Sequence, residues 1–308
     1  MENSERSILV IDDENGIREM ICDYLSEIEG YNVYSASNGI GGLDILKNEK
    51  IDLVLSDINM PGMKGFDLFR EIKELYPLVK RVLITACNVE EYLDLALSHG
   101  IGNIFVKTSP FNFSELSITL KKLLEENIFG LNHYFSDNAE CMCFKIRRSK
   151  KLDKDVCRIS SFIGSRAQIN KLELVLVELL TNAIFYGICN EQPAHKEHWE
   201  HNFVLPEDKA ITVVAAKDEQ KYGISITDTG GKLKKNDVLY WLNRQIATDQ
   251  NGLPLGLYDS HGRGFFIARK YIDRLIVNIY QSCKTEIIMI NYYSDTYKGY
   301  KPLYINEL

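Results

Sequence analysis

Short apolar runs alternate with amphipathic stretches through the first 127 residues of the chain. The apolar runs predict five strands, at Ser7–Ile11, Asn32–Ala36, Leu53–Ser56, Arg81–Thr85 and Asn103–Val106. The stretches that follow them repeat apolar residues at three- and four-residue steps and predict helices at about 16–29, 40–49, 65–75, 90–99 and 112–127. This alternation predicts an α/β fold with a doubly wound, five-stranded parallel sheet that is covered by helices on both faces.

A different pattern follows the first 127 residues. Residues 128–140 mix polar residues with turn-forming ones and predict an interdomain linker. Beyond them, apolar residues recur at helical spacing from Gln168 to Tyr186. Two apolar runs, Ile211–Ala215 and Tyr222–Thr227, predict paired strands, and Phe265–Tyr271 predicts another helix. The chain is therefore expected to contain one domain at 1–127 and a second at 141–308.

Composition agrees with two ordinary globular domains. The chain has 308 residues, of which 45% are hydrophobic, so each domain can bury its own core. Its seven cysteines are irregularly spaced and predict reduced thiols, and the first residues lack an apolar signal core, so a cytoplasmic location is expected. The net charge of −7 and the absence of a long basic stripe argue against nucleic acid as a partner. The apolar run from Leu174 to Leu180 is interrupted by Glu178, which argues against a membrane span.

Polar residues gather where the predicted strands of the first domain end. Asp12 and Asp13 follow the first strand, Asp57 follows the third, Thr85 ends the fourth and Lys107 follows the fifth. In open α/β sheets ligands bind outside the carboxyl ends of the strands, so these side chains are expected to converge. Clustered carboxylates suit Mg²⁺, which leaves open positions for phosphate oxygens. A carboxylate can also act as a nucleophile toward a phosphoryl group.

These residues closely resemble the motifs of response-regulator receiver domains, namely Asp12-Asp13, Asp57-Ile-Asn-Met-Pro-Gly-Met-Lys-Gly65, Thr85-Ala86 and Lys107. The resemblance implies a flavodoxin-like fold in which an upstream histidine kinase phosphorylates Asp57. It also implies that Asp12, Asp13 and Asp57 bind Mg²⁺, that Thr85 is the switch hydroxyl and that Lys107 contacts the phosphate. Two positions depart from the family: Pro110 stands three residues after the lysine, and Ile104 stands where the family usually has an aromatic residue.

The second domain carries three short motifs in order. Glu178 and Asn182 lie one helical turn apart and share a face, where a carboxylate and an amide oxygen can hold Mg²⁺ and position an attacking hydroxyl. The second predicted strand ends in Asp228-Thr-Gly230-Gly, where a buried carboxylate can accept a hydrogen bond from an adenine amino group. Gly262-Arg-Gly264 opens a helix, and the N–H groups at a helix start suit phosphate oxygens.

Together the three motifs resemble the ATP-binding domain of the GHKL superfamily, an α+β two-layer sandwich, and most of all the anti-sigma-factor serine/threonine kinases. That resemblance implies that Glu178 is the general base and Asn182 a Mg²⁺ ligand. It assigns Asp228, Gly230 and Thr285 to the adenine side, Gly262 and Gly264 to the phosphates, and residues 231–261 to a loop that closes over ATP. An anti-sigma antagonist or a sigma factor would then be the downstream partner.

The linker contains one histidine, His133, and has no room for the helical hairpin of a histidine kinase. The sequence therefore predicts a response regulator whose Asp57 controls an ATP-dependent protein kinase. Two alternatives stay open: a binding module that sequesters its partner in an ATP-gated way without catalysis, and a kinase that acts in trans on a phosphotransfer histidine. A homodimer is compatible with the kinase hypothesis and with both alternatives.

Overall fold

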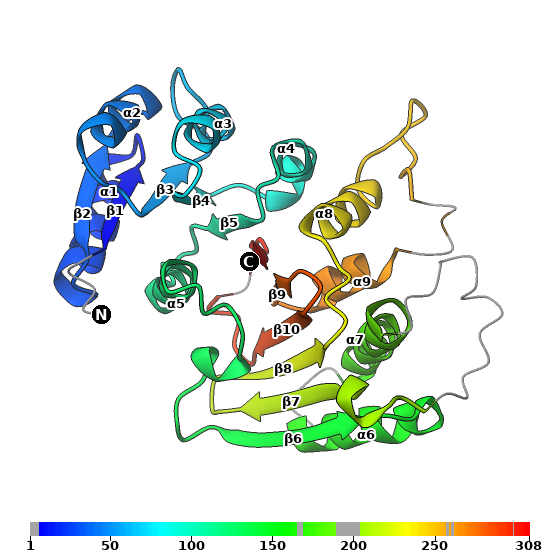
Figure 1. Cartoon of the computed structure of the whole chain (residues 1–308). Helices are drawn as coiled ribbons and strands as arrows, with labels where there is room; N and C mark the ends of the chain where they lie inside the picture. Colours follow the sequence, from blue (N-terminus) through cyan, green and yellow to red (C-terminus); the bar gives the residue numbers. More distant parts are fainter. Residues whose placement is uncertain (1–5, 165–168, 189–203, 257–258, 260–261, 298) are drawn as a thin grey trace. The chain divides into compact units, whose positions relative to one another are not determined.

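Figure 1 shows the chain as a computed structural model, which describes residues 6–164, 169–188, 204–256, 259, 262–297 and 299–308. Contacts between residues divide the chain into two compact units, Met1–Ile128 and Phe129–Leu308. The division falls one residue after the predicted end of the first domain.

The sheet of the first unit has five parallel strands in the order β2-β1-β3-β4-β5. They are β1 (Ser7–Ile11), β2 (Asn32–Ala36), β3 (Leu53–Asp57), β4 (Lys80–Thr85) and β5 (Asn103–Val106). All five residues of β3 are buried, as expected of a central strand that is covered on both faces. Because the strands are parallel, their carboxyl ends lie at one edge of the sheet.

The helices of the first unit form two layers. They are α1 (Asn15–Asp23), α2 (Gly39–Asn48), α3 (Gly65–Leu75), α4 (Leu93–His99) and α5 (Phe113–Leu124), with a π-helical turn η2 (Tyr24–Ile28) after α1 and a 3₁₀ turn η3 (Val89–Tyr92) before α4. Helices α2, α3 and α4 pack against one another in succession. The ring of Phe113 in α5 stacks on Tyr24 in η2, with ring centroids 4.4 Å apart. The strand order β2-β1-β3-β4-β5 reverses direction after the first crossover. Because crossovers between parallel strands are right-handed, this reversal places helices on both faces of the sheet, and the predicted doubly wound fold is confirmed.

The second unit contains a mixed sheet of six strands in the order β11-β9-β10-β8-β7-β6. They are β6 (Glu140–Ile146), β7 (Ile211–Lys217), β8 (Lys221–Asp228), β9 (Arg274–Tyr280), β10 (Lys284–Tyr292) and β11 (Leu303–Glu307). Neighbouring strands are antiparallel except β9 and β11, which are parallel. The predicted hairpin is present as β7 and β8, and the register of β8 with β10 places Asp228 opposite Thr285.

Among the described residues of the second unit, four helices cover one face of this sheet. They are α6 (Leu152–Ile163), α7 (Ile169–Asn182), α8 (Lys235–Arg244) and α9 (Gly264–Tyr271), and α7 continues as a π-helical turn η6 (Ala183–Ile188). Short 3₁₀ turns are η4 (Leu131–Tyr134), η5 (Ser149–Lys151) and η8 (Glu207–Lys209). Helix α7 packs between α6 and α9, and α8 packs against α9 and β11. Leu172, Val175, Leu176 and Leu179 are all buried, so the predicted apolar periodicity of α7 marks the face that meets the core.

Residues 129–139 were expected to belong to a linker, but they pack against the opposite face of the sheet from the helices. Leu131 is buried, and a Cβ atom at Gly223 of β8 would lie 2.8 Å from the ring of Phe135. The main-chain N–H of Gly130 donates to Oε2 of Glu286 in β10 at 2.9 Å. The apolar side chains of this segment explain the difference, because they gain more by covering the sheet than by exposure to water.

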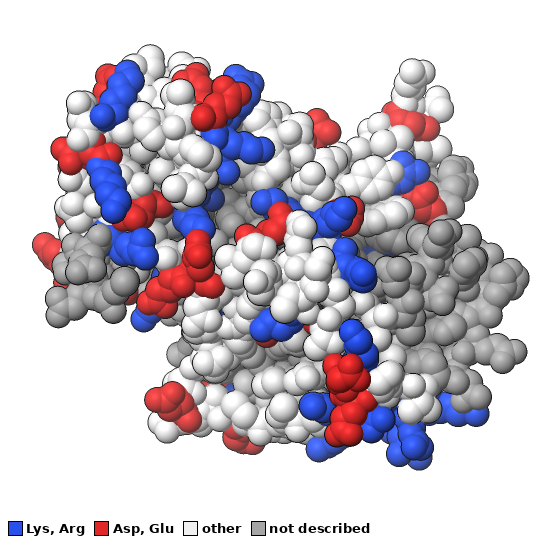
Figure 2. Space-filling model, viewed as in Figure 1, with Lys and Arg blue, Asp and Glu red and all other residues white. Residues whose placement is uncertain are grey.

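Charged side chains of both signs are interspersed on the surfaces that Figure 2 shows for each unit. None of the helices in the described part of the chain is long and apolar enough to cross a membrane.

Candidate functional sites

The first candidate site lies at the carboxyl ends of β1, β3 and β5. The ammonium of Lys107 contacts Oδ2 of Asp12 at 2.8 Å and Oδ1 of Asp57 at 2.7 Å. The side chain of Asp12 is fully buried, and those of Lys107 and Asp57 are exposed by only 6% and 8%. Three of the predicted residues therefore come together, with one positive charge between two carboxylates.

The protonation of this cluster follows from its burial. Burial raises the pKa of Asp57, while Lys107 and the main-chain N–H of Asn59 act in the opposite direction. That N–H donates to Oδ2 of Asp57 at 2.5 Å. Burial by itself would lower the pKa of Lys107, but its hydrogen bonds and attraction to Asp12 and Asp57 raise the pKa above its usual range. Lys107 therefore keeps its charge at neutral pH.

Thr85 ends β4 and is buried beside this cluster. Its hydroxyl oxygen accepts a hydrogen bond from the main-chain N–H of Cys87 at 3.0 Å. Two neighbouring polar residues were missed by the sequence analysis. The amide nitrogen of Asn59 donates to the hydroxyl oxygen of Tyr92 in η3 at 2.6 Å. Asn59 stands two residues after Asp57 and could have been noticed, whereas nothing in the sequence marks Tyr92.

The predicted metal ligands are only partly brought together. Asp13 follows Asp12 in the same loop, and its side chain is exposed to solvent. In the ranges that the structure describes, no three acidic, histidine or cysteine side chains lie close enough together to hold a metal ion. The predicted set of Asp12, Asp13 and Asp57 is not assembled as it stands, because the ammonium of Lys107 occupies the position between the two buried carboxylates.

The two departures from the receiver motifs have clear positions in the structure. Ile104 is fully buried within β5. The next residue, Phe105, is also buried and packs against Phe111, with ring centroids 5.5 Å apart. Phe111 in turn packs on Phe113, with centroids 4.7 Å apart. The aromatic side chain of β5 therefore belongs to a cluster with the start of α5.

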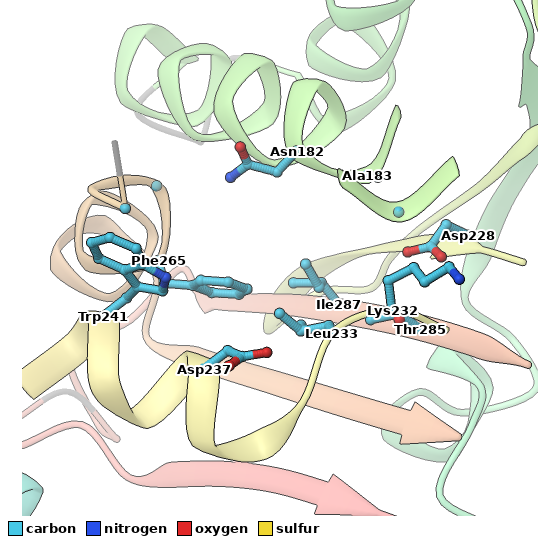
Figure 3. Close-up of a pocket in the computed structure, with 13 residues that line it drawn as sticks. Asn182, Ala183, Asp228, Lys232, Leu233, Asp237, Trp241, Phe265, Thr285 and Ile287 are labelled. Atoms are coloured by element: carbon cyan, nitrogen blue, oxygen red, sulfur yellow. The ribbon is translucent and has the colours of Figure 1, made fainter. Parts of the chain in front are cut away.

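The second candidate site is a cavity of about 230 Å³ in the second unit, between the sheet and helices α7, α8 and α9. It is lined by Asn182, Ala183, Gly187, Asp228, Lys232, Leu233, Asp237, Trp241, Gly262, Gly264, Phe265, Thr285 and Ile287. In Figure 3, Asp228, Lys232 and Thr285 lie at one end, and Trp241 and Phe265 lie at the other. Residues predicted from three separate motifs therefore line one cavity.

Asp228 is the buried carboxylate of this cavity. Its Oδ1 accepts hydrogen bonds from the main-chain N–H groups of Gly230 at 2.9 Å and Gly231 at 3.3 Å. Burial raises the pKa of Asp228 to about 6, although both N–H groups favour the ionised form. Opposite it, the hydroxyl of Thr285 is buried and has no hydrogen-bond partner within the described part of the chain. This end of the cavity thus presents two polar groups to a ligand.

Glycines shape both ends of the cavity. A Cβ atom at Gly230 would overlap the main-chain carbonyl of Gly187, so only glycine fits there. Gly262 has a φ of +80°, and a Cβ atom on it would overlap the indole of Trp241. A Cβ atom at Gly264 would lie 2.7 Å from Nδ2 of Asn182 and 3.4 Å from Oε2 of Glu178. Glu178 and Asn182 therefore both lie beside the first residue of α9.

The segment predicted as a loop over the cavity, residues 231–261, contains the helix α8. Val238, Leu239 and Leu242 of α8 are buried, and their helical spacing could have revealed it. The side chains of Arg244 and Asp259 form an ion pair with hydrogen bonds of 2.5 and 3.0 Å. The sequence analysis missed Asp237 and Trp241, through which α8 lines the cavity.

Comparisons with known proteins bear on the first unit. Residues 8–121 match the family model of the response regulator receiver domain. Sporulation initiation phosphotransferase F of Bacillus subtilis (strain 168) is 32% identical over 117 residues, which are 38% of this chain and 92% of that protein. Sensor histidine kinase RcsC of Escherichia coli (strain K12) is 31% identical over 119 residues, and the chain spans only 12% of its length.

Solved receiver structures are similar over the same region. The receiver domain protein of Methanospirillum hungatei JF-1 is 30% identical, and the match covers 40% of this chain and 96% of that one, with a TM-score of 0.37. The response regulator TrrA of Thermotoga maritima, in complex with Mg²⁺ and BeF, is 39% identical, and the match covers 38% of this chain and 98% of that one, with a TM-score of 0.35.

Proposed function

Because the chain belongs to the response regulator receiver family through residues 8–121, we propose that phosphorylation of Asp57 by a separate histidine kinase controls an ATP-dependent protein kinase in the second unit. The kinase is of the serine/threonine type. Its substrate is a serine of an anti-sigma antagonist, and the downstream partner is that antagonist or a sigma factor.

The cluster around Asp57 suits a phosphate acceptor. Its carboxylate lies at the carboxyl edge of the sheet with Lys107 in contact, and an ammonium in that position can neutralise phosphoryl oxygens. Mg²⁺ prefers carboxylate oxygens, so Asp12, Asp13 and Asp57 would hold it once Lys107 turns to the phosphate. The cation would offset the charge that gathers on the phosphoryl group.

The convergence of Asn182, Asp228, Thr285 and the two glycines on one cavity is the observation that carries the ATP proposal. The residues present fit the nucleotide. The carboxylate of Asp228 and the unpaired hydroxyl of Thr285 can pair with the amino group and a ring nitrogen of adenine. Gly264, at the N-terminus of α9, can approach phosphate oxygens with its main chain.

Glu178 is the proposed general base. Its carboxylate lies beside Gly264 at the start of α9, and Gly264 and the neighbouring Asn182 both line the cavity. There it can accept the proton of a serine hydroxyl, while the amide oxygen of Asn182 supplies a ligand for Mg²⁺. Bound ATP would supply the phosphoryl group.

The test compares the intact chain with Glu178→Ala and with Glu173→Ala, which removes another carboxylate from the same helix. Each protein is incubated with Mg²⁺, radiolabelled ATP and candidate antagonist proteins, with and without beryllofluoride. We expect acid-stable label on a serine of one antagonist, lost in Glu178→Ala and kept in Glu173→Ala. Nucleotide binding should survive in both variants.

The same experiment separates the alternatives. A sequestering module would bind its partner in the presence of ATP and transfer no phosphate, and Glu178→Ala would leave that binding unchanged. A kinase that acts on a phosphotransfer histidine would produce acid-labile label. Intact protein that neither binds ATP nor transfers phosphate in either phosphorylation state would refute the kinase proposal.

A further inference from the structure

The loop after β3 and the segment after β4 are tied together next to Asp57 by the side chain of Asn59, which donates to Tyr92 and to Cys87. The amide nitrogen of Asn59 donates to the hydroxyl oxygen of Tyr92 at 2.6 Å, and it also lies 3.8 Å from the sulfur of Cys87. The main chain of Asn59 contacts the carboxylate of Asp57 at 2.5 Å. The same residue therefore touches Asp57 with its main chain and Tyr92 with its side chain.

Tyr92 is well placed to hold this arrangement. It is the last residue of η3, it is half-buried, and its ring packs on the buried ring of Phe66 with centroids 6.1 Å apart. Burial raises the pKa of the Tyr92 hydroxyl, which stays protonated at neutral pH. A ring that packs on Phe66 restricts where the hydroxyl can lie, and without that hydroxyl the exposed amide of Asn59 would keep only its 3.8 Å contact with Cys87.

We propose that Tyr92 is a positioning residue that prolongs the lifetime of phosphorylated Asp57 by fixing the side-chain rotamer of Asn59. The inference rests on the proposed phosphorylation of Asp57 and is independent of the kinase proposed for the second unit. Neither the receiver motifs nor the family match assigns a role to Tyr92.

The chemistry that Tyr92 restrains is hydrolysis. A water oxygen forms a bond to phosphorus, the bond between phosphorus and the Asp57 oxygen breaks, and its electron pair returns to the carboxylate. The water protons leave with inorganic phosphate and solvent. Once released from Tyr92, the side-chain amide of Asn59 can bind that water through its carbonyl oxygen, or the phosphoryl group through its N–H. Orienting the water or the phosphoryl group in this way speeds the reaction.

The test uses the full chain phosphorylated with acetyl phosphate and Mg²⁺, followed on phosphate-affinity gels after the donor is removed. Tyr92→Phe keeps the ring on Phe66 and removes only the hydroxyl. It should shorten the half-life of the phosphorylated form about three- to tenfold, the range in rate that one hydrogen bond is worth. The matched control is Tyr34→Phe, which removes an exposed hydroxyl bound to Glu49 and should leave the half-life unchanged.

A second variant shows whether Tyr92 acts through Asn59. The Tyr92 hydroxyl also interacts with the side chains of Cys87 and Thr85, so in the background of Asn59→Ala the change Tyr92→Phe should have a much smaller effect rather than none. An unchanged or longer half-life in Tyr92→Phe overturns the inference, and so does an equal shortening in both backgrounds. Failure of the wild-type chain to accept phosphate at Asp57, tested against Asp57→Asn, would instead refute the proposed function.

Discussion

Asp228→Asn should stabilise the second unit at neutral and higher pH. Asp228 has a pKa near 6 against an ordinary value of 3.8, because it is buried with only 5% of its surface exposed. A raised carboxyl pKa means that the native state binds the proton more tightly than the unfolded state does. The contribution of the Asp228 carboxyl to the free energy of unfolding is therefore most favourable below about pH 4 and is lost as the pH rises through 6.

The magnitude follows from linkage. One pKa unit corresponds to about 1.4 kcal/mol, so ionised Asp228 costs about 3 kcal/mol at pH 8 and about half of that at pH 5. Asparagine cannot ionise, and its carbonyl oxygen can still accept from Gly230 and Gly231. The advantage of Asp228→Asn over wild type should therefore grow by about 1.4 kcal/mol between pH 5 and pH 8.

Urea unfolding of the nucleotide-free chain at several pH values measures this difference. Trp241 belongs to the second unit and lines its cavity, so its emission reports the unfolding of that unit. Asp218→Asn removes a carboxylate from the adjoining β7–β8 turn, and its pH dependence corrects for the general change in charge. A stability difference that stays constant from pH 5 to pH 8 would refute the reasoning, because Asp228 would then titrate alike in the native and unfolded states.

Three further predictions concern other residues. Glu286→Ala should destabilise the second unit by about 3 kcal/mol in urea, because three buried or part-buried donors lose their acceptor. Glu286→Gln keeps an acceptor and should recover much of this loss; equal losses would contradict the explanation. Gly65→Ala should lower the thermal stability of the first unit by about 2 kcal/mol, because its methyl group would overlap the main chain of Asp57. Gly16→Ala in α1 meets open space and should raise stability by about 0.5 kcal/mol, so a loss in both variants would count against the steric argument. Lys107→Ala should tighten Mg²⁺ binding about tenfold in calorimetry, because its ammonium competes for two carboxylates, and weaker binding would show that it does not.

The sequence predicted the first unit closely because its signals are local. Each buried strand contains an apolar run of at least three residues, and the parallel order follows from alternation with helices. Predicted bounds of β1, β2 and β5 agree with the structure, and β3 and β4 are each longer by one residue. The positions of Asp12, Asp57, Thr85 and Lys107 at strand ends follow from the same pattern.

What the sequence did not reveal depends on contacts between distant residues. Tyr92 meets Asn59 across 33 positions, and no local pattern announces that hydrogen bond. Helix α8 was not predicted from the sequence because turn-forming residues surround its short apolar face. The position of Lys107 between two carboxylates depends on the packing of three separate strands.

The buried carboxylates of Glu286 and Asp228 differ in how many hydrogen bonds their oxygens accept, and this difference indicates which of them can bind a ligand. Glu286 accepts from Ser225 at 2.8 Å, from Asn278 at 2.9 Å and from the main chain of Gly130, which leaves it little capacity for a ligand. Asp228 lies in β8, two strands away from Asn278 in β9. It accepts main-chain hydrogen bonds through Oδ1 and faces a cavity. A buried acid that is incompletely paired is unstable unless a ligand completes it. By that criterion Glu286 stabilises the fold, whereas Asp228 has an oxygen available for the nucleotide that we propose.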